Sequence, residues 1–198
     1  MKKAILLSGG IDSVALCYWL RPDVAITIDY GQLPAPAEIE VSRKVCKELH
    51  IPHEVVTVDC RRLGSGDLAG TESLGMSPSR EWWPYRNQLL ATIASMKAIG
   101  LGVDEIIFGS VKSDSFHADG TFAFYTQLNN LLKMQEGGLT VSVPAITMSS
   151  GELVIASGIP SSLLCWAHSC HISDVACGNC RGCFKHQSVM HEIGYGFY

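Results

Sequence analysis

Short apolar runs alternate with longer apolar or amphipathic segments along most of the chain. The short runs predict buried strands at residues 4–7, 24–28, 54–58, 104–108 and 141–144. The segments between them predict helices at residues 14–20, 37–49, 88–100 and 122–134, and a short helix from 150 that ends at 158–160. Strands and helices that alternate at these lengths are typical of a parallel sheet covered on both faces. We therefore predict an α/β domain with five parallel strands.

Residues 60–79 depart from this alternation. The segment is rich in Gly, Ser and Asp and has little periodicity. A connection of this length is typical of a lid, a binding loop or disorder. It is followed by Trp82 and Trp83, and two adjacent tryptophans either stack on a flat heterocycle or plug the core. The sequence favours neither role over the other.

A glycine turn, Ser8-Gly9-Gly10-Ile11-Asp12-Ser13, joins the first predicted strand to the first predicted helix. Amides in such a turn and in the first helical turn lack intrahelical partners, and the helix dipole adds partial positive charge. The two glycines allow close approach of oxygen atoms, and the two serines add hydroxyl donors. The turn therefore predicts an anion site, most naturally for phosphates. The alternative is a tight connection in which Asp12 or Ser13 is the N-cap.

Asp12 is an unusual residue for a phosphate site, because its carboxylate repels phosphate unless a cation lies between them. A nucleotide bridged by Mg²⁺ would satisfy both groups. The turn also lacks the lysine with which the Gly-rich loop of P-loop NTPases binds the β- and γ-phosphates. A different class of nucleotide site is therefore indicated.

Composition narrows the possible partners. Of the 198 residues, 47% are hydrophobic and 17% are charged, which allows a sizeable core in one domain with a small appendage. The net charge of −4 argues against a broad nucleic-acid surface and favours a small-molecule substrate. No apolar run reaches the length of a membrane span, and the N-terminus is unlike a signal peptide. We expect a cytoplasmic protein without a membrane partner.

The chain has eight cysteines, and five of them lie after residue 164. The series Cys170-x6-Cys177-x2-Cys180-x2-Cys183 offers four soft ligands, which suit one tetrahedral Zn²⁺. An iron–sulfur cluster and a redox C-x-x-C are the alternatives, but the two extra cysteines argue against a redox pair. His168 or His171 would be able to replace a cysteine. We predict one structural zinc ion that ties a C-terminal segment of helix and loop, residues 161–198, to a body formed by residues 1–160.

The glycine turn resembles the pyrophosphate loop of the N-type ATP pyrophosphatases. Together with the cysteine series it resembles the 7-cyano-7-deazaguanine synthase (QueC-like) family, and the likeness runs nearly from end to end. Residues 29–32, Asp-Tyr-Gly-Gln, are similar to that family's Tyr-Gly-Gln, and residues 84–87, Pro-Tyr-Arg-Asn, to its Pro-Gly-Arg-Asn. Trp166, Ser169 and Cys170 are similar to its Trp-Ser-Cys, with two residues inserted.

The resemblance implies a Rossmann-like fold of the adenine nucleotide alpha hydrolase (HUP) type, and a homodimer. It also implies an ATP-dependent ligase that converts 7-carboxy-7-deazaguanine to an amide and then to a nitrile with ammonia. In that reaction the carboxylate takes AMP, pyrophosphate leaves into the glycine turn, and ammonia displaces AMP. A second adenylation, on the amide oxygen, permits loss of water to the nitrile.

Site residues follow from the positions that match this family. The residues expected to bind ATP are Leu7, Ser8, Gly9, Gly10, Asp12 and Ser13. Those expected to bind the deazaguanine are Tyr30, Gln32, Arg86, Asn87, Asp114 and Asp119. The expected catalytic residues are Asp12, Arg86 and Lys112. The two cations would stabilise phosphate charge or, alternatively, be solvated surface charges. The aspartates at 114 and 119 would accept hydrogen bonds from the deazaguanine N–H edge or, alternatively, cap the helix that starts near residue 122.

Three positions depart from the family pattern. Leu33-Pro34 stands for Arg-His, Gly120-Thr121 for Cys-Arg, and Ser149-Ser150 for a lysine. We expect ATP binding and adenylation to remain while a later step differs. One alternative is a diverged ligase that stops at the amide and joins the deazaguanine carboxylate to another amine, such as a protein N-terminus, in antiviral defence. Further alternatives are a tRNA-modifying pyrophosphatase and a nucleotide-sensing subunit.

Overall fold

The computed structural model describes residues 1–77 and 79–195 and contains one five-stranded parallel sheet. Its strands are β1 (Lys3–Leu6), β2 (Val24–Asp29), β3 (His53–Thr57), β4 (Glu105–Ile107) and β5 (Thr140–Ser142). The strand order is β3-β2-β1-β4-β5, and Ile5 of β1 pairs with Ala25 of β2 and with Ile107 of β4. The predicted α/β fold with five parallel strands is therefore confirmed.

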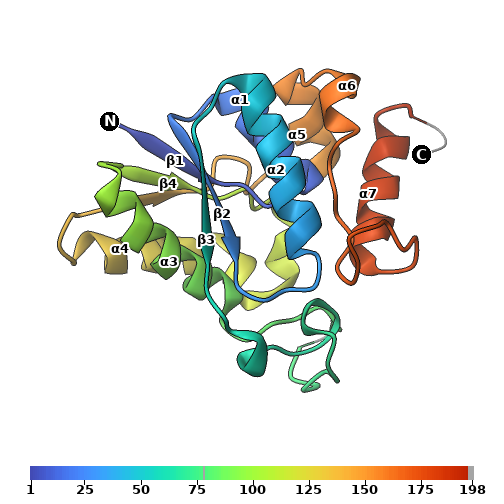
Figure 1. Cartoon of the computed structure of the whole chain (residues 1–198), viewed down its shortest axis with the longest axis horizontal. Helices are drawn as coiled ribbons and strands as arrows, with labels where there is room; N and C mark the ends of the chain where they lie inside the picture. The colour runs from blue at the N-terminus through green and yellow to red at the C-terminus, as the bar shows by residue number, and fades with distance from the viewer. Residues whose placement is uncertain (78, 196–198) are drawn as a thin grey trace.

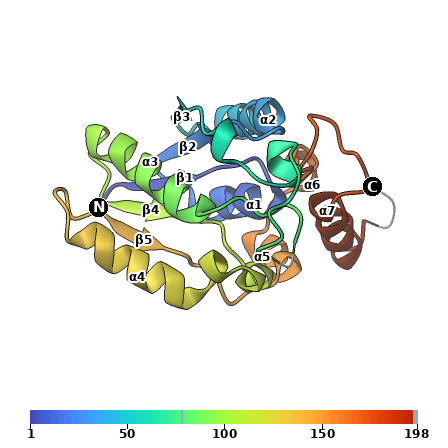
Figure 2. The same ribbon diagram turned by 90° about the horizontal axis from the view of Figure 1, so that it is seen from below.

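Helices cover both faces of the sheet (Figures 1 and 2). The helices on one side are α1 (Ile11–Leu20), α2 (Ala35–Leu49) and α5 (Ser150–Ser157), with α6 (Ser161–Leu164) and α7 (Arg181–Glu192) outside them. The opposite face carries α3 (Arg86–Gly100) and α4 (Phe122–Lys133). α1 begins earlier than the apolar pattern predicted, inside the glycine turn. α2 begins with Pro36 in its first turn, a position at which proline is tolerated.

The direction of chain progression reverses at the centre of the sheet. From β1 the chain builds outward to β2 and β3, and it then crosses through α3 to β4 on the other side of β1. Such a reversal leaves a crevice at the carboxyl ends of the two central strands, where open α/β sheets bind ligands. The glycine turn leaves β1 at this point.

Two hydrophobic clusters hold the layers together. The first joins the sheet to α1, α5 and the C-terminal helices, and it includes Leu16, Leu153 and Met190. The second lies under α3 and α4 and includes Trp83, which is buried with its ring centroid 4.9 Å from that of Tyr30 in an edge-on contact. Trp83 is thus part of the core, which decides between its two predicted roles.

The long connection after β3 contains two short 3₁₀ turns, η1 (Arg61–Leu63) and η2 (Asp67–Ala69). Position 78, within the segment predicted as a long loop, lies outside the described residues. The Asp67 amide donates to the Arg80 carbonyl at 2.8 Å, and a Cβ at Gly66 would lie 1.8 Å from the same oxygen. This close approach closes the loop and buries Leu68 against the pocket described below.

The C-terminal segment was predicted as helix and loop without helix bounds, and the structure places its longest helix, α7, at residues 181–192. Val189 and Met190 of α7 are buried in the same cluster as α1 and α5, so residues 161–195 pack directly on the body. Among the described residues, none of the helices combines the length and apolar character needed to cross a bilayer.

Candidate functional site

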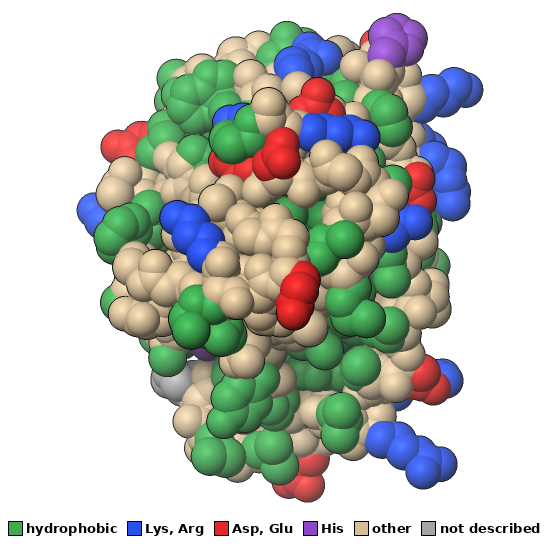
Figure 3. All heavy atoms as spheres, turned by 90° about the vertical axis from the view of Figure 1, so that its left-hand side faces the viewer, with side chains coloured by type: hydrophobic (Ala, Val, Ile, Leu, Met, Phe, Trp, Pro, Cys, Tyr) green, Lys and Arg blue, Asp and Glu red, His purple; other side chains and the backbone are tan. Residues whose placement is uncertain are grey.

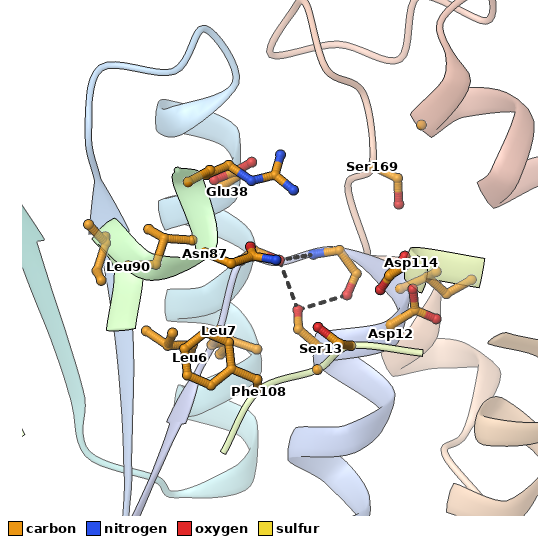
Figure 4. A pocket seen from close by; sticks show the side chains of 18 of the residues that line it. Leu6, Leu7, Asp12, Ser13, Glu38, Asn87, Leu90, Phe108, Asp114 and Ser169 are labelled. Atoms are coloured by element: carbon orange, nitrogen blue, oxygen red, sulfur yellow. Dashed lines mark hydrogen bonds between the residues drawn. The ribbon is translucent and has the colours of Figure 1, made fainter. Parts of the chain in front are cut away.

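A pocket of about 280 Å³ opens at the carboxyl ends of β1, β2 and β4. Its walls come from the glycine turn, the start of α3, the loop after β4, and the C-terminal segment from His168 to Lys185. Figure 4 shows Leu6, Leu90 and Phe108 on one side of the pocket and Asp12, Asp114 and Ser169 on the other. One end of the pocket therefore suits a flat apolar group of a ligand, and the other end suits its charged groups.

The polar end is built around the glycine turn. Ser8 Oγ lies 3.2 Å from Ser13 Oγ, which donates to the Gly10 carbonyl at 3.0 Å (Figure 4). Gly10 is the N-cap of α1 and offers no side-chain acceptor, so the predicted alternative of Asp12 or Ser13 as N-cap is wrong. Gly9 has φ +72°, and a Cβ there would lie 3.0 Å from a carbonyl oxygen of α2. The first amides of α1 thus remain available to an anion.

Asp12 is paired with a lysine that sequence reasoning missed. Lys185 Nζ, from α7, lies 2.7 Å from Asp12 Oδ2 and 3.3 Å from Asp114 Oδ1. Burial disfavours the charge on Lys185, but the two carboxylates outweigh it and raise its pKa. The other Asp12 oxygen, Oδ1, is buried and has no hydrogen-bond partner in the part of the chain that the structure describes. No periodicity marks Lys185 in the sequence, because its position depends on how the cysteine segment folds.

A second cation enters the pocket from the first position of α3. Burial disfavours the charge of Arg86, yet Tyr30, Asp119, Asp114 and Glu38 together raise its pKa. Burial also raises the pKa of Glu38 to about 7, against the hydrogen bond from Gln32 Nε2 at 2.8 Å, which lowers it. Glu38 was not predicted as a site residue. It gives the pocket a carboxyl group that titrates near neutral pH.

The structure brings most of the predicted site residues together. Those that line the pocket are Leu7, Ser8, Gly10, Asp12, Ser13, Tyr30, Arg86, Asn87 and Asp114. Those that do not line it are Gly9, Gln32, Lys112 and Asp119.

Three of these outlying residues have other positions or partners in the structure. Gln32 is buried, accepts from the Tyr30 amide and donates to Glu38, so it supports the wall from behind. Asp119 accepts from the Asn87 amide at 3.3 Å. Lys112 is exposed at the surface of the loop after β4.

The loop after β4 forms two 3₁₀ turns, η3 (Lys112–Phe116) and η4 (Ala118–Gly120). Asp114 accepts from the Val111 amide at the start of η3, which fixes its carboxylate beside the pocket. The N-cap of α4 is Thr121, whose hydroxyl accepts from the Phe124 amide. The alternative in which one of the two aspartates caps α4 is therefore wrong.

The four predicted ligand cysteines converge beside the pocket. Ligand atoms of Cys170, Cys177, Cys180 and Cys183 lie within 4.8 Å of one another, with Sγ pairs at 3.8 and 3.9 Å. Four sulfur atoms at about 2.3 Å from one tetrahedral ion lie about 3.8 Å apart, so these thiols fit a single metal ion. The Asn179 amide donates to Cys177 Sγ and lowers the pKa of that thiol to about 7. The His171 amide donates to Cys180 Sγ, but burial outweighs it and raises the pKa of Cys180. Neither flanking histidine belongs to this group, so the set consists of four cysteines.

The cysteine segment is attached to the glycine turn. The His168 amide donates to the Gly9 carbonyl at 2.8 Å, and Gly182 packs so closely on Ser169 that a Cβ would lie 1.8 Å from its carbonyl oxygen. Outside the pocket, Arg181 pairs with the buried Glu81 at 2.7 Å. One wall of the pocket is therefore a part of the cysteine segment.

Comparison with known proteins gives the family. The chain matches the family described as "Queuosine biosynthesis protein QueC" over residues 2–194. It is 32% identical to a 7-cyano-7-deazaguanine synthase of Desulforudis audaxviator, with 98% of each chain covered, and 28% identical to one of Methanothermobacter thermautotrophicus, with 98% and 96% covered. Among solved structures it shares the fold of the U34-tRNA thiolase NcsA of Methanococcus maripaludis, solved with its [4Fe-4S] cluster (TM-score 0.58, 17% identity, 96% of this chain but only 63% of the thiolase). A parallel sheet with a phosphate-type glycine turn, a four-cysteine segment against it and a match along nearly the whole chain together show that this protein belongs to the QueC family.

Proposed function

We propose that the protein is an enzyme that uses ATP to adenylate the carboxylate of 7-carboxy-7-deazaguanine and that releases AMP and pyrophosphate. The observation that carries the proposal is one pocket that joins the uncapped amides of α1, two cations and an apolar slot. The names of its relatives, 7-cyano-7-deazaguanine synthases, supply the substrate class. The activated carboxylate then takes ammonia to form the amide, and a second adenylation gives the nitrile.

The residues of the pocket divide this work. The amides at the start of α1 and the hydroxyls of Ser8 and Ser13 bind the phosphates that become pyrophosphate. Lys185 and Arg86 stabilise the negative charge that develops as the bond between the α- and β-phosphates breaks. The apolar side chains around Phe108 hold a flat base and exclude water. Catalysis of the adenylation consists of positioning and charge stabilisation, because in that step the AMP group moves from one oxygen atom to another.

Two metals fit the residues present. Asp12 has a buried carboxylate oxygen that no described residue satisfies, and Asp114 lies close to the same lysine, so this pair suits Mg²⁺ bound with the nucleotide phosphates. Mg²⁺ would neutralise phosphate charge. The four thiols suit one Zn²⁺, because their spacing is that of ligands to a single ion, whereas a four-iron cluster holds its cysteines farther apart. Zinc would have a structural role, with all four positions occupied by the protein.

The direct test is to incubate the purified protein with 7-carboxy-7-deazaguanine, ATP, Mg²⁺ and ammonium, and to measure nucleotides and product mass together. The proposal predicts AMP and pyrophosphate in step with an amide or a nitrile. Asp12→Asn should abolish AMP formation, and Lys133→Met, on the exposed face of α4, should not. Formation of ADP, or of no product mass, would contradict the proposal.

A diverged second step is the second candidate, and specific contacts favour it. Leu33, which stands where the family has a cation, packs on Gly70 of the long connection, and Ser149 caps α5 where the family has a lysine. Apolar and capping contacts have thus replaced charges at these two positions. This candidate predicts accumulation of the amide, or its attachment to another amine such as a protein N-terminus, with no nitrile.

A tRNA substrate is a poorer fit. On the face shown in Figure 3, lysine and arginine side chains are dispersed among acidic ones rather than gathered into a basic patch.

We also propose that the protein acts as a homodimer, as the family resemblance implies, with a small-molecule substrate. Light scattering of the protein as it elutes from a size-exclusion column would test the dimer. A tRNA gel shift at physiological salt would test the tRNA alternative.

A further inference from the structure

Lys185 contacts the predicted phosphate site from outside the nucleotide-binding body. Its ammonium group lies between two carboxylates, 2.7 Å from Asp12 and 3.3 Å from Asp114, where the chain leaves β1 for α1. Without a cation between them, two carboxylates in one pocket repel each other. Lys185 therefore compensates both negative charges beside the amides that would bind phosphate.

The same carboxylate has capacity for a second partner. Asp12 Oδ2 faces Lys185, while Asp12 Oδ1 is buried and unpaired among the described residues, an arrangement that costs free energy unless a ligand satisfies it. A divalent cation that binds carboxylate and phosphate oxygens would satisfy it. Such a cation would also compete with the ammonium group for Asp12 and Asp114.

Lys185 has a route to the phosphates. Its side chain is 32% exposed and has a flexible four-carbon stem, so the ammonium group can leave the carboxylates without movement of α7. The residues beside it in the pocket wall include Ser169 and Gly182 from the same segment and Ser13 from the glycine turn. A modest rotation keeps it within the polar end of the pocket.

We propose that Lys185 is an exchangeable counter-ion, which holds Asp12 and Asp114 before the nucleotide arrives and transfers to the phosphates when Mg²⁺ takes its place between the carboxylates. This inference rests on the proposed use of ATP. It assigns to the cysteine segment a part in the reaction, because Lys185 follows the last ligand cysteine by two residues. The helix that carries Lys185 also packs on α5, where Glu192 lies against Gly151, so the lysine is presented from a helix held to the body.

An ordinary structural ion pair makes a different prediction from an exchangeable one. If Lys185 only stabilised the fold, its loss would weaken every ligand alike or weaken none. If it competes with the divalent cation and then binds phosphate, its loss must change the two affinities in opposite directions. The test is therefore the sign of two binding changes measured on one variant.

The experiment uses Mn²⁺ as a paramagnetic probe for Mg²⁺, and pyrophosphate and α,β-methylene-ATP as probes for the phosphates, on the full-length protein with its zinc loaded. Lys185→Met should bind Mn²⁺ more tightly in the absence of nucleotide and bind both phosphate probes more weakly. We expect each change to be about tenfold, the size of one charged hydrogen bond. Lys185→Arg should restore phosphate binding, and Lys133→Met should match the wild type throughout.

Each outcome decides a separate point. If Lys185→Met weakens both Mn²⁺ and pyrophosphate binding, or changes neither, the exchange is overturned. If the methionine variant does not fold, Lys185→Arg decides. Because it retains the charge, it must bind Mn²⁺ within about twofold of the wild type and must bind the phosphate probes, and failure of either would overturn the exchange. If the wild type binds pyrophosphate and Lys185→Met shows the two opposite changes in affinity, but the wild type yields no AMP, the proposed function fails while the role of Lys185 stands.

Discussion

Gly182→Ala tests whether the cysteine segment completes the pocket. Gly182 lies in the first turn of α7, and a Cβ there would lie 1.8 Å from the Ser169 carbonyl oxygen, whereas ordinary contacts begin at 3.4 Å. The helix and the segment at Ser169 would have to separate by about 1.6 Å. Lys185 lies one turn further on the same face of α7, so it would move with this displacement.

The expected cost combines two opposing effects. Overpacking against backbone typically costs about 1–3 kcal/mol, because a carbonyl group cannot rotate away as a flexible side chain can. Replacing glycine by alanine in a helix returns up to about 1 kcal/mol. We therefore expect Gly182→Ala to lower the free energy of unfolding by about 1 kcal/mol. The variant should also bind pyrophosphate more weakly, because the shift would displace Lys185, which now lies 2.7 Å from Asp12, from the polar end of the pocket.

The assay pairs urea unfolding with calorimetric titration of pyrophosphate. Gly100→Ala is the matched control, because Gly100 ends α3 with no left-handed φ, and a Cβ added to it would meet nothing within 4 Å. That control should raise the free energy of unfolding by up to about 1 kcal/mol and leave pyrophosphate affinity unchanged. A Gly182→Ala protein with wild-type stability and affinity would refute the packing argument.

Glu38, Cys180 and Tyr85 each allow a test by a single substitution. Because burial raises the pKa of Glu38 from 4.5 to about 7, the folded state retains a proton that the unfolded state has lost, so the free energy of unfolding should fall by up to about 3 kcal/mol as pH rises across this interval. Glu38→Gln should flatten that pH dependence, and parallel curves for the two proteins would show that Glu38 is not its source. Cys180→Ser should release the metal, which mass spectrometry of the wild type should show as one zinc per chain, and should lower the melting temperature. Iron in place of zinc in the wild type would overturn the choice of metal. Tyr85→Gly should raise the free energy of unfolding by about 1 kcal/mol, because Tyr85 has φ +54° and an exposed ring, and a destabilised variant would mean that the ring makes a packing contribution.

The sheet and its helices were predictable because each strand is a short apolar run and each connection is long enough for one helix. The run at residues 4–7 became β1 and the glycine turn became the start of α1, so the location of the proposed phosphate site follows without any tertiary information. The cysteine spacing likewise predicted which four thiols would converge, since C-x2-C steps bring sulfur atoms close enough to share one ion.

The cations of the pocket were harder to predict from the sequence. Arg86 lines the pocket as expected, because it starts a helix that follows the sheet edge, but Lys112 lies exposed outside the pocket, and Lys185 takes a place in the wall. The position of Lys185 depends on α7, whose bounds were not predicted because its apolar residues Val189 and Met190 form too short a pattern. Tertiary packing of the cysteine segment, rather than local periodicity, decides which lysine enters the site.

The measurement that tests the central claim most directly is the fate of oxygen in the substrate carboxylate. With 7-carboxy-7-deazaguanine labelled with ¹⁸O at that group, the first turnover should place one labelled oxygen in AMP and none in pyrophosphate, because the carboxylate attacks the α-phosphorus while the α1 turn binds the leaving diphosphate. Unlabelled AMP, or label recovered in inorganic phosphate beside ADP, would contradict the account.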